Sequence, residues 1–303
     1  MTTLVTGGSG LIGMALRAIL AARGDRVVPI DIADHGRDDP ALRLVRLDDR
    51  AALEALIAAE AIDSIVHCGA ISGPMMARGE PLALVSANID ATALLLDLAR
   101  RHAMRRFVFC SSISVYGDVG AATIDEATPL RPTSVYGATK VACEQLIRGF
   151  AAEYGLSGVS LRIGRVYGPY RRANCHLKAL IRASELGLEA EIPCEPAFVY
   201  HYVYADDVAE ALCAALDAPA LPNLEYNVGA GEALTMPAIL ASLAAREPGL
   251  RARLVPGVDD VADVQTAFDV GRIGRDLGWT PRFDIAEGVL AYRDAIRQGR
   301  AAG

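Results

Sequence analysis

The feature that most limits how this chain can fold is a regular alternation of short apolar runs with longer helical patterns. Runs typical of buried strands occur at residues 3–6, 26–31, 42–47, 64–67, 106–110 and 159–163. Helical patterns lie between them at residues 11–23, 50–60, 82–102 and 134–154. Continuous apolar strands separated by helices predict a parallel sheet covered on both faces, which is a doubly wound α/β domain of the Rossmann type.

The alternation becomes irregular after residue 168. Shorter strands are expected around residues 189–192, 198–203, 225–228 and 253–255, with helices at 206–217, 237–246 and 286–297. These elements are too short and broken to repeat the first sheet. We therefore expect a Rossmann domain over 1–168 and, over 169–303, mainly a smaller α/β substrate-binding lobe, some segments of which return to the Rossmann core.

Charge and cysteine usage exclude several classes of protein. The chain has 30 Lys plus Arg against 37 Asp plus Glu, so it lacks the basic excess that nucleic-acid binding needs. No apolar run approaches the ~18 residues of a membrane span, and no signal peptide is recognisable, so we expect a cytoplasmic protein without a membrane partner. The six cysteines contain no C-x-x-C pair and are expected to be reduced core residues, with no metal site.

A glycine-rich segment joins the first strand to the first helix. Its glycines, Gly7, Gly10 and Gly13, would allow a tight turn and close approach of the backbone to a pyrophosphate on the helix N-terminus. An ordinary β–α turn is the alternative. Asp31 ends the second strand, where a carboxylate binds ribose hydroxyls and repels a 2′-phosphate, so NAD is favoured over NADP. Arg37 on the same loop argues the other way.

Tyr136 and Lys140 have the spacing that places two side chains on one helix face. A free phenol has a pKa of ~10, and a neighbouring ammonium favours the phenolate that can act as a base. Ser112 follows the strand at 106–110, at the sheet edge where ligands bind, and could hydrogen-bond the oxygen that Tyr136 deprotonates. The alternatives are a surface tyrosine packed on a lysine and a serine that only caps a turn.

Further landmarks make nearly the whole chain resemble the extended short-chain dehydrogenase/reductase family, of the NAD-dependent epimerase/dehydratase type. They are His67-Cys68-Gly69-Ala70, Asn88, Val115-Tyr116-Gly117, Leu161-Arg162, Val166-Tyr167-Gly168-Pro169, the segment 204–209, Tyr226-Asn227-Val228-Gly229 and Leu277-Gly278-Trp279-Pro281. The resemblance implies that Tyr136 is the general base, that Lys140 binds the nicotinamide ribose and tunes Tyr136, and that Ser112 orients the reacting oxygen.

The resemblance also implies NAD contacts and a partner. The expected cofactor residues are Gly7, Ser9, Gly10, Leu11, Ile12, Gly13, Asp31, Ile32, Leu47, Asp48, Cys68, Gly69, Ala70, Asn88, Tyr136, Lys140, Ile163 and Val166. Members often form homodimers through the two helices that match residues 82–102 and 134–154, which could pack as a four-helix bundle. The same apolar faces could equally be internal core.

Departures from the family pattern bear on the substrate. Dehydratases carry an Asp-Glu pair where this chain has Ile113 and Ser114, so a 4,6-dehydratase is not expected. Arg165 replaces a common Asn and Tyr200 replaces a common diphosphate-binding Arg, which favours a smaller, carboxylated substrate held by Arg165. A surface ion pair of Arg165 is the alternative. The predicted substrate residues are Ser72, Ser112, Ser114, Arg165, Arg172 and His201, although His201 could also be an ordinary buried histidine.

Two enzymatic functions follow. The first is an NAD-dependent dehydrogenase of a sugar, sugar acid or related polyol, in which Tyr136 removes a hydroxyl proton while hydride passes to the nicotinamide. The alternative is a UDP-hexose type 4-epimerase that uses the same step reversibly, since Arg171 and Arg172 could still hold a diphosphate. A cofactor-sensing protein without catalysis would not need the Ser112, Tyr136 and Lys140 set.

Overall fold

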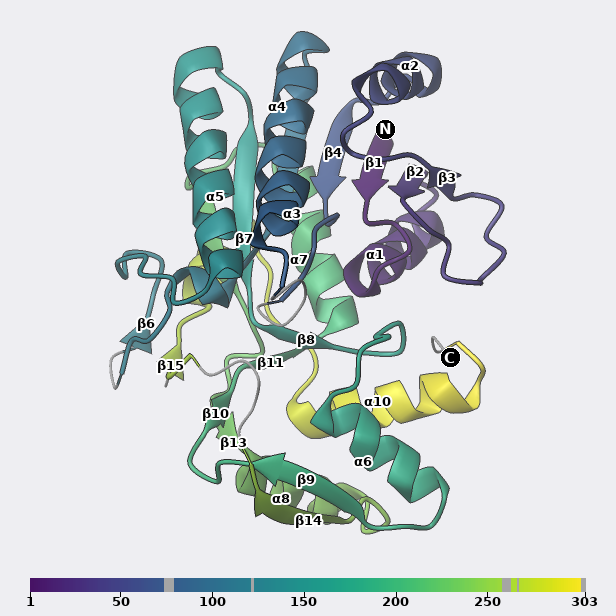
Figure 1. Cartoon of the computed structure of the whole chain (residues 1–303), viewed down its shortest axis with the longest axis vertical. Helices are drawn as coiled ribbons and strands as arrows, with labels where there is room; N and C mark the ends of the chain where they lie inside the picture. Colours follow the sequence, from purple (N-terminus) through teal and green to yellow (C-terminus); the bar gives the residue numbers. More distant parts are fainter. Residues whose placement is uncertain (74–78, 121–122, 258–262, 266, 301–303) are drawn as a thin grey trace.

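The large sheet of the computed structural model has seven strands in the order β12-β7-β5-β4-β1-β2-β3, and all its neighbouring strands are parallel (Figure 1). The structure describes residues 1–73, 79–120, 123–257, 263–265 and 267–300. The strands are β1 (Thr2–Thr6), β2 (Arg26–Asp31), β3 (Arg43–Leu44), β4 (Ser64–His67), β5 (Arg106–Ser112), β7 (Gly158–Ile163) and β12 (Glu225–Val228). This topology confirms the predicted doubly wound fold.

Helices cover both faces of this sheet because each buries an apolar stripe against the continuous apolar strands. Side chains of α1 (Leu11–Ala22) and α7 (Ala205–Asp217) share one core with strand residues. Side chains of α2 (Arg50–Glu60), α4 (Ala91–Arg101) and α5 (Val135–Tyr154) share the core on the opposite face. Figure 1 shows α4 and α5 standing side by side.

The strand order reverses between β1 and β4. From β1 the chain moves outward to β2 and β3, then returns to place β4 on the other side of β1 and continues to β5. In such sheets the crevice at the carboxyl ends of the two central strands is where ligands bind. The glycine turn follows β1, and the segment from Cys68 to Ala70 follows β4, so both lie at this crevice.

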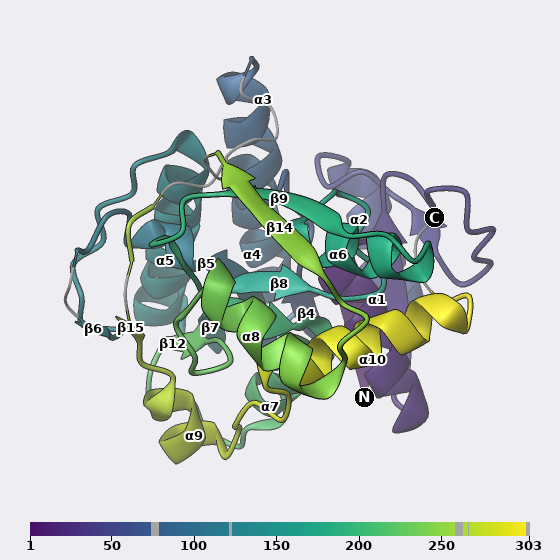
Figure 2. The ribbon, with the colours of Figure 1, turned by 90° about the horizontal axis from the view of Figure 1, so that it is seen from below.

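A second lobe with its own apolar core lies below the carboxyl edge of the sheet in the view of Figure 1, and Figure 2 shows it from below. Its main elements are α6 (His176–Glu185), β9 (Ala190–Cys194), β10 (Val199–Tyr200), β13 (Leu234–Thr235), α8 (Met236–Arg246), β14 (Ala252–Pro256) and α10 (Ile285–Arg297). Further short elements of the chain are the 3₁₀ turn η2 (Ile113–Val115), β6 (Thr123–Ile124), β8 (Arg165–Tyr167), β11 (Tyr202–Tyr204), β15 (Ala267–Phe268) and α9 (Gly271–Leu277). Because α7 packs against the large sheet and β12 is one of its strands, the chain crosses between the lobes more than once.

The helix expected over residues 82–102 is divided into α3 (Pro81–Val85), the π-helical turn η1 (Ser86–Asp90) and α4. Within the described residues, Pro81–Arg101 is the one helical stretch that is long and apolar enough to cross a membrane, although the sequence analysis expected no such segment. A helix that packs against a protein core passes the same test, and part of this one lies in the core. The finding is therefore weak evidence for a membrane partner.

Candidate active site

The turn between β1 and α1 leaves no room for side chains at its glycines. Gly7 has φ +65°, and a Cβ there would lie 2.7 Å from the Gly69 nitrogen. A Cβ on Gly13 would lie 2.1 Å from the carbonyl oxygen of Gly7. Gly10 is the N-cap of α1, and no described side chain hydrogen-bonds there. The turn thus leaves the helix N-terminus open to an anion, which fits the pyrophosphate of NAD.

Asp31 ties the end of β2 to the glycine turn. Its carboxylate accepts hydrogen bonds from the Ser9 amide at 3.1 Å, the Ser9 hydroxyl at 2.6 Å and the Ile32 amide at 2.8 Å. A carboxylate offers about four acceptor sites, so capacity remains for a ribose hydroxyl. Arg37, the residue whose position favoured NADP in the sequence, donates from Nη1 to the Ser9 carbonyl at 2.6 Å. Burial and the nearby Arg172 lower the pKa of Arg37.

A directed chain of hydrogen bonds runs beneath the crevice. The Gly69 amide donates to Thr6 Oγ1 at 3.0 Å, and Thr6 Oγ1 lies 2.6 Å from His67 Nδ1. On the other side, His67 Nε2 lies 3.2 Å from Thr92 Oγ1, which donates to the Asn88 carbonyl at 2.6 Å. The Thr92 oxygen must then accept from Nε2–H, while Nδ1 accepts from Thr6. Burial lowers the pKa of His67 to about 3, so the ring is neutral.

Asn88 lies inside the π-helical turn and joins the loop after β4 to the catalytic helix. Its side-chain oxygen accepts from the Ile71 amide at 2.9 Å, and its nitrogen donates to Thr139 Oγ1 at 3.0 Å. Such π-turns often mark functional sites. The buried amide therefore positions the predicted cofactor loop, while its own contact with NAD stays a prediction.

Tyr136 and Lys140 lie on one buried face of α5, as the sequence predicts. The Lys140 ammonium donates to the Cys110 carbonyl at 2.8 Å and lies 5.7 Å from the centroid of the Tyr136 ring. It also lies 4.6 Å from the Phe109 ring centroid. The structure thus holds a cation beside the phenol that is expected to abstract the proton.

Ser112 reaches the same edge of the sheet from the end of β5. Its hydroxyl accepts a hydrogen bond from the Ser114 amide at 3.2 Å, which starts the η2 turn. This turn and α5 approach closely, because a Cβ on Gly137 would lie 2.4 Å from the Ser114 carbonyl oxygen. The structure therefore brings the segments that carry Ser112, Tyr136 and Lys140 together at the crevice.

A buried ion pair next to these residues was not singled out from the sequence. Arg162 on β7 donates from Nη2 to Glu144 Oε2 at 2.8 Å, and Glu144 is fully buried. Ser111 Oγ donates to Glu144 Oε1 at 2.5 Å. Glu144 follows Lys140 by four residues, and this helical spacing is the signal that could have identified it.

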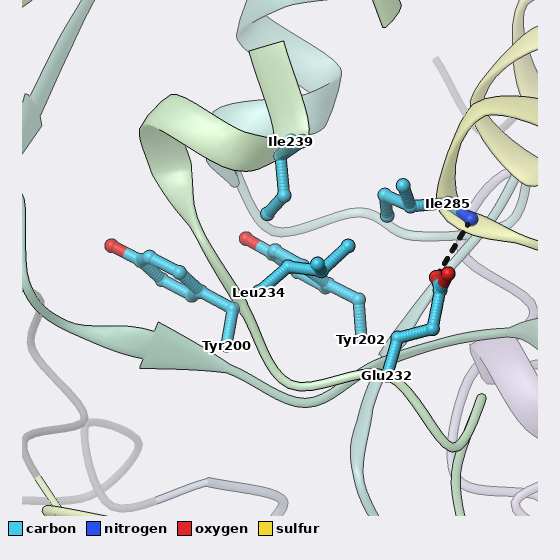
Figure 3. Close-up of a pocket in the computed structure, with 6 residues that line it drawn as sticks. All are labelled: Tyr200, Tyr202, Glu232, Leu234, Ile239 and Ile285. Atoms are coloured by element: carbon cyan, nitrogen blue, oxygen red, sulfur yellow. Dashed lines mark hydrogen bonds between the residues drawn. The ribbon is translucent and has the colours of Figure 1, made fainter. Parts of the chain in front are cut away.

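Arg165 lies where the chain leaves the sheet for the second lobe. It begins β8, which pairs in parallel with β11. Its guanidinium lies 5.5 Å from the ring centroid of Tyr200 and 5.6 Å from that of Tyr202, and these two rings are stacked 5.4 Å apart. Both tyrosines also line a cavity of about 10 Å³ inside the lobe, shown in Figure 3, which is too small for a sugar.

Arg172 and His201 occupy different surroundings. Arg172 contacts His35 on the loop after β2, beside the predicted cofactor residues. Lys178 holds the segment that carries Arg172 by donating to the Arg171 carbonyl at 2.9 Å. His201 is buried, its ring lies 5.7 Å from that of Phe268, and burial lowers its pKa.

The remaining predicted residues divide by exposure. Asp48 is exposed and paired with Arg46 at 2.7 Å, and Ile32 and Ser72 are exposed too, so their contacts with cofactor or substrate stay predictions. Ser114 is buried, and Ala70 is half-buried. Packing at the crevice involves Leu11, Ile12, Cys68, Ile163 and Val166 in one core, while Leu47 lies beside Gly69.

Comparison with known proteins agrees with this geometry. The model of the NAD dependent epimerase/dehydratase family matches residues 3–229. A UDP-glucose 4-epimerase from Corynebacterium glutamicum is 28% identical over 98% of this chain and 97% of its own length. A dTDP-glucose 4,6-dehydratase from Neisseria gonorrhoeae is 30% identical over 94% of this chain and 92% of its own length.

A solved structure extends the agreement to the fold. MoeE5 in complex with UDP-glucuronic acid and NAD is 29% identical, with a TM-score of 0.85, over 99% of this chain and 100% of that chain. The family match covers most of the chain, including the glycine turn, Ser112, Tyr136 and Lys140. The chain therefore belongs to the NAD dependent epimerase/dehydratase family and is an NAD-using enzyme of the extended short-chain dehydrogenase/reductase type.

Proposed function

We propose that this enzyme is a 4-epimerase of a nucleotide sugar. The observation that carries the proposal is the Lys140 ammonium, anchored on the Cys110 carbonyl and held 5.7 Å from the centroid of the Tyr136 ring. The relatives act on or bind nucleotide-linked sugars, and this supports the epimerase over the sugar dehydrogenase that sequence reasoning placed first.

The chain's own residues would handle the proton of the reacting hydroxyl. The Tyr136 phenolate would take this proton, Ser112 would hydrogen-bond the oxygen, and Lys140 would keep the phenolate charge balanced. The chemistry that NAD supplies at this site is the reversible acceptance of a hydride from the sugar carbon. A proton lost to Tyr136 and a hydride lost from carbon together leave a ketone. Returning the hydride to the opposite face of the carbonyl carbon, and the proton to the carbonyl oxygen, gives the epimer.

Elimination of water is not expected at this site. The positions where dehydratases carry an acid pair are Ile113 and Ser114, and neither has a carboxyl group. Both lie in the η2 turn directly after Ser112. We therefore expect no 4-keto-6-deoxy sugar among the products, despite the similarity to dehydratases.

The test is an incubation of purified enzyme and NAD with UDP-glucose, UDP-galactose, UDP-glucuronate, or the matching free sugars and acids. Products are identified by NMR, while NADH absorbance is followed in the same tubes. The proposal expects a 4-epimer of at least one nucleotide sugar with no steady NADH accumulation. Steady NADH formation from a free sugar or sugar acid, with no epimer, would contradict it and establish the dehydrogenase.

A further inference from the structure

Strand β5 and helix α5 are joined by two successive contacts at the crevice. The last three residues of β5 are 110–112, and α5 presents Tyr136, Lys140 and Glu144 at intervals of four residues on one buried face. In a helix this spacing stacks side chains one turn apart. The catalytic Tyr136 and Lys140 therefore share their face with a third polar side chain, which proton abstraction does not use.

The two contacts use consecutive residues of the strand. Lys140 Nζ donates to the carbonyl oxygen of Cys110 at 2.8 Å, and Ser111 Oγ donates to Glu144 Oε1 at 2.5 Å. Ser112 comes next along the chain and carries the hydroxyl expected to orient the substrate oxygen. The Ser111–Glu144 hydrogen bond thus lies between the anchor of the ammonium and the catalytic serine.

Glu144 can hold this position because its charge is balanced inside the protein. Arg162 donates to both of its carboxylate oxygens, from Nε at 3.1 Å and from Nη2 at 2.8 Å. Burial opposes the charge on Arg162, yet the hydrogen bonds and attraction of Glu144 raise the pKa of the guanidinium above its usual range. A buried, bidentate pair of this kind has little freedom to change geometry.

The same arginine braces the segment after the catalytic serine. Arg162 Nη1 donates to the Tyr116 hydroxyl at 2.9 Å, and this hydroxyl donates to Asn227 Oδ1 on β12 at 2.7 Å. Tyr116 directly follows the η2 turn that Ser112 caps. Arg162 therefore holds both the strand end before the turn, through Glu144, and the chain after it.

We propose that Ser111, Glu144 and Arg162 form a positioning triad that fixes the end of β5 against α5. The triad keeps the Cys110 carbonyl under the Lys140 ammonium and so holds the positive charge beside Tyr136. The proposal rests on the proposed function for the reaction that is measured, and any other hydride transfer at this site would test it equally. In this proposal the three residues act only through Lys140 and Ser112.

Ser111→Ala is the sharpest variant, because it removes one contact and leaves the Glu144–Arg162 pair intact. Removing Glu144 or Arg162 would instead leave an unpaired buried charge and endanger folding. Ser111→Thr keeps the hydroxyl and is the rescue. Ser157→Ala is the matched control, since it removes the hydroxyl that accepts from Arg106 Nη1 at 2.8 Å, at the opposite end of β5.

The experiment measures kcat, KM and NAD affinity for each variant, with whichever substrate the wild type turns over. For Ser111→Ala we expect kcat to fall about tenfold with KM and NAD affinity unchanged. Ser111→Thr should restore kcat, and Ser157→Ala should leave it unchanged.

The two proposals fail in different ways. If the wild type forms NADH from a free sugar and epimerises no nucleotide sugar, the proposed function fails, while kcat of that reaction still decides the positioning role. An unchanged kcat in Ser111→Ala would overturn the triad. Equal losses of kcat in Ser111→Ala and Ser157→Ala would overturn it as well, because the effect would then be a general loosening of the sheet.

Discussion

Lys140 uses one of its three N–H donors to hydrogen-bond a backbone carbonyl oxygen, and this bond fixes the position of its charge. A flexible lysine would share its ammonium with water, whereas this one is buried and bonded to Cys110. The charge therefore lies near the phenol of Tyr136 before any substrate binds. Because this charge lies beside Tyr136, substitution of Tyr136 is the first test of the site.

Tyr136→Phe should abolish proton abstraction and leave the protein folded. Only the phenolic hydroxyl is removed, so we expect turnover to fall by about 10²–10⁴-fold. NAD affinity should change little, because the glycine turn and Asp31 are untouched. Stopped assays of turnover and a fluorescence titration with NAD check both expectations, with Tyr154→Phe at the exposed end of α5 as the control. Loss of NAD binding in Tyr136→Phe would refute the role of base.

His67 makes stability depend on pH. Its folded pKa of about 3 lies below the ~6.5 of an unfolded chain, so the unfolded state binds more protons between these values. Its contribution is complete above pH 6.5 and is lost as pH falls toward 3. Between pH 7 and pH 5 the free energy of unfolding should drop by about 2 kcal/mol through this residue. Urea unfolding of wild type and His67→Gln measures it: equal pH slopes for the two proteins would contradict the assignment.

At the scale of single elements, the turn between β1 and α1 is the part least able to accept change. A Cβ at Gly13 meets the Gly7 carbonyl oxygen at 2.1 Å, so Gly13→Ala must open the turn. We expect NAD affinity to fall about tenfold or more. Gly149→Ala is the control, because a Cβ there meets nothing within 4 Å, and it should stabilise α5 by about 0.5–1 kcal/mol. Calorimetric titration with NAD compares them, and unchanged affinity in Gly13→Ala would contradict the role of the turn.

The elements of the first half could be predicted because their signals are local. The central strands there are continuous apolar runs, and the main helices carry apolar stripes, so the order of these elements could be predicted from the sequence alone. The π-helical turn at Ser86–Asp90 had no such signal, since its residues also suit an α-helix. The strand expected over 42–47 pairs only at Arg43–Leu44, because β3 is an edge strand with one neighbour.

Local sequence patterns predicted the second lobe less completely than the first half. The helices α6 and α9 were missed: α6 mixes charged residues with its apolar positions, and α9 has only seven residues. The return of β12 to the large sheet depends on pairing with β7, which no short window of sequence contains. In the site, Tyr136 and Lys140 were predictable from their spacing. The buried Glu144 was not singled out, because its partners Ser111 and Arg162 lie on other strands.

At the scale of the whole molecule, two apolar cores flank the sheet, a third fills the second lobe, and a small fourth cluster includes Tyr116 and Phe268. Some large apolar side chains remain outside them, and Leu82 on α3 is 82% exposed. Val135 at the start of α5 is 48% exposed. These positions border the pair of helices through which the family resemblance implies a homodimer.

We expect light scattering to give twice the 32.0 kDa mass of one chain. Ala138 is exposed on α5, so Ala138→Arg should leave the monomer fold intact while a buried charge opposes a four-helix contact. Leu186→Arg, at a position that is 73% exposed on the second lobe, is the control and should keep the dimer. A monomeric wild type, or a dimer unaffected by Ala138→Arg, would exclude this interface.

Because the ammonium groups of both lysines are bonded to backbone carbonyls, the folded surface offers reagents almost no primary amine. Lys140 donates to Cys110, Lys178 donates to Arg171, and the other basic side chains are arginines. Amine-directed acylation should therefore leave both lysine side chains of the folded chain largely unmarked. An acyl group found on either lysine by mass spectrometry would show that this lysine has become accessible. Labelling of Lys140 would therefore report local opening at the catalytic helix α5.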